Sequence, residues 1–271
     1  MVFSILRRRS MTLIAIGGAE DKEGAMTVHR RVLDESHGAR SRVCVITSAT
    51  AEPAAAKERY EAVYKKLGVE DCTVLHIDSR AMANSDAVAA VLEKADVVFF
   101  TGGDQMRLTQ AMAGTRAFDV IAEKYAAGAL VIAGTSAGAA AASSLMVCGG
   151  DPEKSMQKGE VQMTAGFGLL QGAVIDTHFS ERNRLPRLFN AVATHPATLG
   201  IGVDEDTAAV LRKGGIIEIV GSGTVTFVDG RGIERCNMAD VERGEVFEAA
   251  GFRVDKLPAG ARYDLKTRRP S

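Results

Sequence analysis

The sequence lacks the features that mark nucleic-acid-binding and membrane proteins. Its 33 Lys and Arg residues balance 34 Asp and Glu residues, and a formal net charge of −1 gives no electrostatic reason to expect a polyanionic partner. Apolar residues make up 46% of the chain, but they never form a run long enough to span a bilayer. We therefore expect no nucleic acid and no membrane as partner.

Paired cysteines and metal-ligand patterns are also missing. The 4 cysteines are scattered, and no Cys-x-x-Cys pair occurs. This spacing favours buried, reduced thiols over disulfides or a zinc site. The spacing of histidines and carboxylates resembles no ligand set, so we expect no metal and no cofactor.

The N-terminus has little of a secretory signal. Its apolar residues precede Arg7, Arg8 and Arg9, whereas a signal peptide has the reverse order and a longer apolar region. We expect residues 1–10 to be a frayed extension and the protein to be cytoplasmic.

Short apolar segments alternate with helical patterns over the first half of the chain. The expected strands are Leu13–Ile16, Val43–Ile46, Val74–Ile77, Val97–Phe100 and Leu130–Ala133. The expected helices include Pro53–Lys66, Ser85–Glu93 and Gln105–Gly114. Strands that are apolar on both faces and alternate with helices predict a doubly wound, mostly parallel α/β sheet flanked by helices. Sites in such folds form beyond the carboxyl ends of the strands.

The pattern changes after about residue 199. Closely spaced apolar segments separated by Gly-rich turns predict antiparallel strands that extend the sheet. The expected strands are Leu199–Val203, Ala208–Leu211, Ile216–Val220 and Thr224–Val228. There is no internal repeat, low-complexity linker or domain boundary, so we expect one α/β domain over residues 11–265 and a disordered polar tail at residues 266–271.

Ser136 lies in a Gly-x-Ser-x-Gly pentapeptide, Gly134–Gly138, that follows an apolar strand and precedes a run of alanines. Strand, tight turn and helix form the context of a nucleophile elbow. The alternative to a catalytic role is a tight turn with a buried hydroxyl. Glycine-bearing segments also follow the first and fourth expected strands, at Gly17 and Thr101. One site built from three strand ends is the simplest arrangement.

A serine nucleophile needs a base, and His178 is the best placed of the 5 histidines. It ends the apolar segment that begins at Ala173 and precedes a polar cluster. The cluster around it contains Asp176, Arg182, Arg184 and Arg187. Arginine binds carboxylates bidentately and aspartate binds guanidinium groups in the same way. The cluster therefore predicts a substrate that carries both signs of charge, although a solvated helix start would also explain it.

Together these motifs resemble the cyanophycinase family of serine peptidases, which shares the flavodoxin-like fold of class I glutamine amidotransferases. The matching segments, in chain order, are Thr101–Gln105, Gly134–Ala139, Asp176–Arg187 and Gly200–Thr207. The resemblance implies hydrolysis of cyanophycin, a poly-aspartate whose side-chain carboxyls carry arginine, to β-aspartyl-arginine dipeptides. It also implies a homodimer.

The resemblance further implies roles for individual residues. Ser136 would be the nucleophile and His178 the base, with the backbone N–H groups of Gly103 and Ala137 binding the oxyanion. The positions matching substrate-binding residues are Gln105, Asp176, Thr177, Arg182, Arg184 and Arg187. The family takes its third triad member, a glutamate, from the segment between nucleophile and histidine. Glu153 is the best match there, with Asp151 and Glu160 as alternatives.

Two other functions remain open at this point. A related dipeptidase for aspartyl or isoaspartyl peptides would use the same nucleophile with a shallower pocket that has fewer arginines. An inactive binding or scaffolding protein of the same fold is less compatible with an intact serine and histidine. A true amidotransferase would normally carry cysteine at the position of Ser136.

Overall fold

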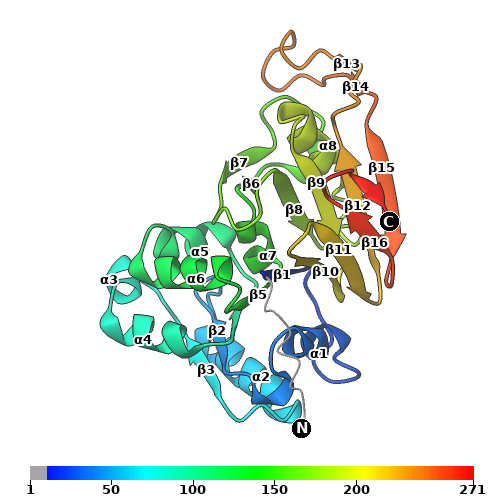
Figure 1. The fold of residues 1–271 in the computed structure, drawn as a ribbon. Coiled ribbons are helices and arrows are strands. Elements are labelled where there is room, and N and C mark those ends of the chain that lie inside the picture. Colours follow the sequence, from blue (N-terminus) through cyan, green and yellow to red (C-terminus); the bar gives the residue numbers. More distant parts are fainter. Residues whose placement is uncertain (1–10) are drawn as a thin grey trace.

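The structure, a computed structural model, describes residues 11–271, and the expected frayed extension at residues 1–10 lies outside them. A nine-stranded and a four-stranded sheet dominate the fold (Figure 1). Across the larger sheet the strands are β17 (Arg269–Pro270), β16 (Arg262–Asp264), β11 (Ile216–Gly221), β10 (Thr207–Arg212), β1 (Thr12–Ile16), β5 (Val131–Thr135), β4 (Val97–Phe100), β2 (Val43–Ile46) and β3 (Cys72–Leu75).

The centre of the larger sheet is parallel, and its C-terminal strands are antiparallel. β1, β5, β4, β2 and β3 pair in parallel, whereas β10, β11, β16 and β17 pair antiparallel. The predicted fold class is therefore confirmed. In this register Ile16 lies beside Thr135, and Phe100 lies beside Gly134. The loops after β1, β4 and β5 consequently meet at one edge of the sheet.

Helices cover both faces of the parallel strands. The helices of the first half are α1 (Thr27–Asp34), α2 (Pro53–Lys66), α3 (Arg80–Ala83), α4 (Asp86–Lys94), α5 (Gln105–Met112), α6 (Arg116–Ala126) and α7 (Ala137–Ala142), and a 3-10 turn, η1 (Gly38–Arg40), follows α1. α1 and α2 bury Val32 and Tyr64 against Ile14 on one face. α4 to α7 pack with Leu13 and Phe100 on the other, because successive strand residues point to opposite faces. Within residues 11–271 no helix combines the length and apolarity needed to cross a membrane.

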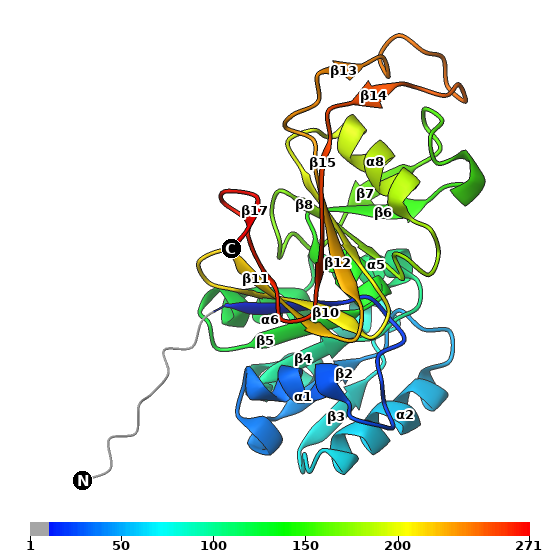
Figure 2. The ribbon, with the colours of Figure 1, turned by 90° about the vertical axis from the view of Figure 1, so that its right-hand side faces the viewer.

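The smaller sheet differs from the expectation. Its strands are β15 (Arg253–Pro258), β12 (Thr224–Asp229), β9 (Leu199–Val203) and β8 (Ala173–Thr177). The strands predicted at Leu199–Val203 and Thr224–Val228 therefore exist but do not extend the main sheet. They pair with each other, and β9 pairs in parallel with β8. Figure 2 shows this sheet standing above β10, with α8 (Leu185–Thr194) beside it.

One core joins the two sheets, and a second lies under α8. Ile201 and Phe227 of the smaller sheet belong to the same apolar cluster as Leu13. On its other face, Val174 packs with Leu188 of α8. The remaining elements are β6 (Leu145–Gly149), η2 (Pro152–Lys154), β7 (Gln162–Ala165), β13 (Arg235–Cys236) and β14 (Ala249–Ala250).

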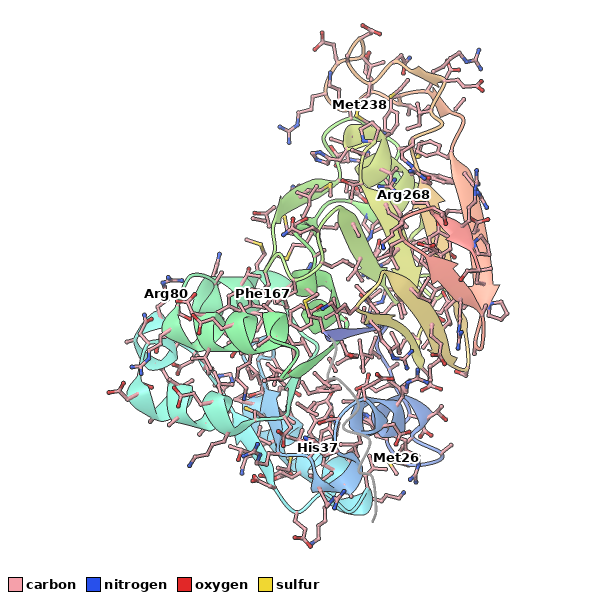
Figure 3. All side chains as sticks on the ribbon, in the orientation of Figure 1. Met26, His37, Arg80, Phe167, Met238 and Arg268 are labelled. Carbon is pink, nitrogen blue, oxygen red and sulfur yellow. The ribbon has the colours of Figure 1, made fainter. Side chains whose placement is uncertain are left out.

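The C-terminal residues are held by specific contacts rather than forming the expected disordered tail. Arg269–Pro270 make up β17 and pair with β16. Arg268, labelled in Figure 3, forms an ion pair with Asp229 at 2.7 Å. The polar composition predicted disorder, but these residues instead form a strand and a largely buried ion pair.

Candidate active site

Ser136 occupies the turn between β5 and α7 in an unusual backbone conformation, with φ 51° and ψ −108°. A non-glycine residue in such a region costs about 1–3 kcal/mol and persists only where its surroundings hold it. Its N–H donates to the carbonyl of Ile16 on β1 at 3.0 Å. At Gly134 a Cβ atom would lie 2.4 Å from the backbone of Gly138, so the strand and helix can approach this closely only without side chains.

His178 reaches Ser136 from the smaller sheet. Its Nε2 atom lies 3.0 Å from Oγ of Ser136, and its Nδ1 atom lies 2.6 Å from Oε1 of Glu205. The backbone N–H of His178 donates to the carbonyl of Gly17 at 2.7 Å, which ties the histidine to the loop after β1. At Gly18 a Cβ atom would come within 2.3 Å of the imidazole, so a glycine leaves room for the ring.

The three side chains form a relay of hydrogen bonds. An ionised carboxylate only accepts hydrogen bonds, so Glu205 holds the imidazole with its hydrogen on Nδ1. Nε2 is then left to accept the proton of the Ser136 hydroxyl. The arrangement is that of nucleophile, base and orienting acid.

The structure does not place Glu153 at the imidazole. Glu153 lies exposed in η2, where its N–H donates to Asp151. Asp151 caps that turn, and its carboxylate lies 3.7 Å from Nζ of Lys154. Glu160 lies in the loop that follows η2. The prediction that the acid comes from this segment is wrong for the geometry observed, because Glu205 contacts Nδ1 of His178.

Parallel pairing of β8 and β9 explains why Glu205 is the partner. Thr177 lies beside Val203 at the carboxyl ends of the two strands. His178 directly follows Thr177, and Glu205 lies two positions after Val203. Both residues therefore leave the sheet at the same edge. The signal in the sequence was the acidic stretch Asp204–Asp206 after an apolar strand, but it indicates a partner for His178 only once the strand pairing is known.

Gly103 and Ala137 lie where an oxyanion site would be expected. Both line the same pocket as Ser136. Ala137 is the first residue of α7, where helices leave backbone N–H groups without an internal partner. Within residues 11–271 the N–H of Gly103 has no backbone carbonyl partner either.

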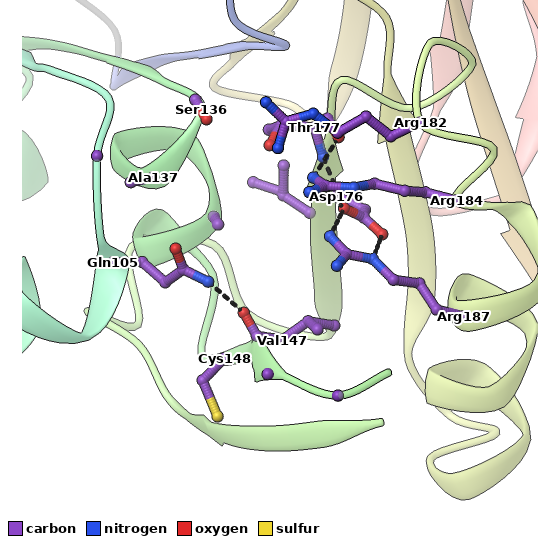
Figure 4. A pocket seen from close by; sticks show the side chains of 15 residues that line it. Gln105, Ser136, Ala137, Val147, Cys148, Asp176, Thr177, Arg182, Arg184 and Arg187 are labelled. Atoms are coloured by element: carbon purple, nitrogen blue, oxygen red, sulfur yellow. Dashed lines mark hydrogen bonds and ion pairs between the residues drawn. The ribbon is translucent and has the colours of Figure 1, made fainter. Parts of the chain in front are cut away.

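The residues predicted to bind substrate converge on one pocket of about 140 Å³ beside Ser136, which we call the arginine pocket (Figure 4). They are Gln105, Asp176, Thr177, Arg182, Arg184 and Arg187. Gln105 comes from the far wall, where its amide donates to the carbonyl of Val147 at 2.8 Å. Cys148, which sequence reasoning did not single out, also lines the pocket.

Asp176 already forms ion pairs with arginines of its own chain. It is buried and accepts hydrogen bonds from Nε of Arg187 at 2.6 Å and from Nη1 of Arg184 at 3.3 Å (Figure 4). Burial lowers the pKa of Arg184 to about 10, against the attraction of Asp176. It stays charged at neutral pH. Three arginines against one aspartate give the pocket a net positive charge, which suits a carboxylate more than a guanidinium.

A buried polar cluster supports the nucleophile turn from behind. Glu20, only 3% exposed, accepts hydrogen bonds from Thr135 at 2.6 Å and from Tyr60 at 3.0 Å. Although burial disfavours its charge, nearby Lys22 and the Thr135 hydroxyl hold the pKa of Glu20 below its usual value. Because Thr135 precedes Ser136, this carboxylate fixes the strand end that carries the serine.

His29 beside this cluster should make the protein sensitive to acid. It is fully buried, and neither ring nitrogen has a hydrogen-bond partner within residues 11–271. Burial lowers its pKa from 6.5 to about 4. Since the unfolded chain binds the proton more readily, stability is unaffected above about pH 6.5 and is lost as the pH falls towards about 4. We expect this histidine to cost about 2 kcal/mol at pH 5.

Urea unfolding of the wild type and of His29→Leu, at pH 8 and at pH 5, measures this contribution. The free energy of unfolding should fall less in the variant between the two pH values, by about 2 kcal/mol. Comparing the change with pH cancels any packing defect that the substitution causes at both pH values. Equal changes in the two proteins would contradict a neutral, buried His29.

Comparison with known proteins agrees with this geometry. The family model described as "Peptidase family S51" matches residues 11–219. The chain belongs to peptidase family S51. Like the other members of this family it is a peptidase, and therefore a hydrolase.

Two curated relatives named cyanophycinase match nearly the whole chain. One, from Geminocystis herdmanii, is 36% identical over 96% of this chain and 95% of its own length. Another, from Trichormus variabilis, is 37% identical over 94% of this chain and 86% of its own. A crystal structure of a peptidase from an acI-B1 Actinobacterium superposes with a TM-score of 0.70 at 19% identity, covering 95% of this chain and 98% of the other, which supports the fold alone.

Proposed function

We propose that this S51 peptidase is a serine exopeptidase that hydrolyses cyanophycin and releases β-aspartyl-arginine. The proposal is carried by the Ser136–His178–Glu205 relay, which opens directly onto a positively charged pocket. Each branch of cyanophycin joins the α-amino group of an arginine to an aspartate side chain, so every branch keeps a free α-carboxylate. Arg182, Arg184 and Arg187 supply the complementary charge. The relatives named cyanophycinase support the same substrate.

The geometry suggests a conventional acyl-enzyme mechanism. His178 Nε2 takes the proton of Ser136 as Oγ attacks a backbone carbonyl of the polymer. The N–H groups of Gly103 and Ala137 receive the oxyanion. The imidazolium then gives its proton to the leaving amine, and a water molecule activated by the same nitrogen hydrolyses the ester. Glu205 holds the ring throughout.

In this mechanism the role of Asp176 differs from the predicted one, which was to bind a guanidinium group of the substrate. Its carboxylate is paired with Arg184 and Arg187, so it orients these guanidinium groups towards the pocket instead of receiving the guanidinium of the substrate. Gln105 and Thr177 contribute neutral hydrogen-bonding groups to the same walls. We therefore assign the recognition of carboxylates to the arginines.

Incubation of purified protein with cyanophycin, and separately with a panel of Asp-X and isoAsp-X dipeptides, tests the substrate. We expect release of β-aspartyl-arginine from the polymer at a higher kcat/KM than hydrolysis of any dipeptide in the panel. Chromatography of the free dipeptide provides the measurement. Faster hydrolysis of the Asp-X panel would instead establish the aspartyl dipeptidase.

The site is shared between the two sheets, which supports residues 11–265 acting as one hydrolytic domain. Ser136 follows β5 of the larger sheet, and His178 and Glu205 follow β8 and β9 of the smaller one. Neither sheet could supply the relay alone. We further propose a cytoplasmic homodimer, for which light scattering of the purified protein and fractionation of cells are the measurements.

A further inference from the structure

A second hollow, of about 420 Å³, also opens at Ser136, and we call it the lysine hollow. Ser136, Gly103 and Arg182 line both it and the arginine pocket. His178 and Lys22 line the lysine hollow but not the arginine pocket. Ser136 therefore lies between two cavities, and His178 lines only one of them.

The position of His178 distinguishes the two halves of a substrate. In acyl transfer the imidazolium must donate its proton to the leaving nitrogen, which requires that nitrogen within about 3 Å of Nε2. The leaving half must then extend into the hollow that His178 lines. The acyl half is left with the arginine pocket, where Ala137 offers its N–H to the oxyanion.

The charge of the lysine hollow shows what the leaving half should carry. Arg59 of α2 is exposed on its wall, and within residues 11–271 its guanidinium has no carboxylate within ion-pair distance. Arg182 is likewise exposed and unpaired in the described part of the chain. Lys22 adds a third positive charge, although its Nζ lies 3.0 Å from Oε1 of Glu20.

The acidic side chain in the wall, Glu20, offsets only one of these three positive charges, that of Lys22. Glu20 is buried, and its two oxygens already accept from Tyr60 and Thr135. Arg59 and Arg182 therefore present two guanidinium groups without ion-pair partners, within residues 11–271, to the hollow, and such groups favour an anionic ligand.

We propose that the lysine hollow is the leaving-side subsite and that Arg59 binds a carboxylate of the leaving half. This assignment rests on the proposed function, which makes that carboxylate the α-carboxylate of a branch arginine. Both halves of the substrate would then be recognised by arginine, the acyl half through Arg184 and Arg187 and the leaving half through Arg59. The polymer would lie across Ser136 with one branch on each side.

A pair of substrates that differ in one charge tests this assignment. Both contain two β-aspartyl-arginine units joined by a backbone peptide bond and keep free backbone termini, as an exopeptidase requires. In one, the branch arginine of the leaving unit keeps its carboxylate; in the other, this carboxylate is a methyl amide. We expect the wild type to prefer the carboxylate form by about tenfold in kcat/KM.

Substitution of Arg59 should remove that preference. In Arg59→Ala the ratio of the two kcat/KM values should fall towards one, and Arg59→Lys should retain part of it because it keeps the charge without the bidentate geometry. Lys65→Ala is the matched control, because Lys65 is exposed on the same helix but does not line the hollow. Its ratio should equal that of the wild type.

Two kinds of failure can be told apart. A wild type without preference, or a preference that survives in Arg59→Ala, would overturn the leaving-side subsite while the hydrolysis itself upholds the proposed function. Absence of turnover for both substrates would contradict the proposed function and, with it, the assignment of its subsites.

Discussion

Replacement of Ser136 with alanine is expected to lower kcat on cyanophycin by about 10⁴- to 10⁶-fold. Without Oγ no acyl-enzyme can form, and His178 loses the group whose proton it takes. What remains is the contribution of the oxyanion donors and of substrate binding, which is typically about 10³–10⁴ over the reaction in water. KM should change little, because the arginine pocket keeps all its charged residues.

The same substitution should leave the fold intact. Alanine keeps the Cβ atom of serine, so the strain of the positive φ at position 136 is unchanged. The backbone hydrogen bond to Ile16 and the packing of Gly134 against Gly138 do not involve the hydroxyl. Thermal unfolding should therefore place Tm close to that of the wild type.

Labelling with a fluorophosphonate separates an active serine from a buried one. The wild type should be labelled at Ser136 under native conditions, and Ser136→Ala should not be labelled at all. A wild type that resists labelling would favour the inactive scaffolding protein. Equal rates of dipeptide release by the two proteins would exclude Ser136 as nucleophile.

The part of the site on the larger sheet could be predicted from the sequence. The chain from Leu13 to Ala133 alternates apolar strands with helices, and such a pattern implies parallel strands whose carboxyl ends share one edge. Ser136 follows one of these strands and the glycine-bearing segment that begins at Thr101 follows another, so local pattern predicts that both lie at this edge. β1, β5 and β4 are neighbours in the sheet, so the glycine-bearing loops converge as expected.

The pairing of the later strands could not be read in the same way. Leu199–Val203 and Ala208–Leu211 look alike locally, yet the first belongs to the smaller sheet and the second to the larger one. Apolar periodicity indicates that a segment is a strand, but the partner depends on contacts between distant parts of the chain. β9 pairs with β8 of the same smaller sheet, and no local signal in either strand specifies that choice.

The wrong prediction of the third triad residue follows, because strand pairing could not be predicted from the sequence. The family resemblance implies an acid between Ser136 and His178, and Glu153 is the best match in that segment. The register of β8 with β9 instead brings Glu205, which lies beyond the histidine in sequence, to Nδ1 at 2.6 Å. Catalytic triads recur with different chain orders on different folds, so geometry rather than sequence order identifies the third member.

Replacement of Glu205 with glutamine is expected to lower kcat by about 10²- to 10⁴-fold with little change in KM. The amide has nearly the shape of the carboxylate but lacks its charge, and its NH₂ group can donate to the imidazole and favour the tautomer with hydrogen on Nε2. In that tautomer His178 cannot accept the proton of Ser136. The carboxylate is 36% exposed, which places the expected loss towards the lower end of the range.

Glu153→Gln is the matched control for this experiment, because it makes the same chemical change on the exposed η2 turn. Its kcat should equal that of the wild type. Glu205→Asp should recover part of the lost rate, since it restores the charge at a greater distance from Nδ1, whereas a residue that only supports the fold would show no such dependence on charge. A large loss in Glu153→Gln together with full activity in Glu205→Gln would return the orienting role to the segment after Ser136. The opposite result would establish that the two sheets share one catalytic relay, with the nucleophile on one and its base and acid on the other.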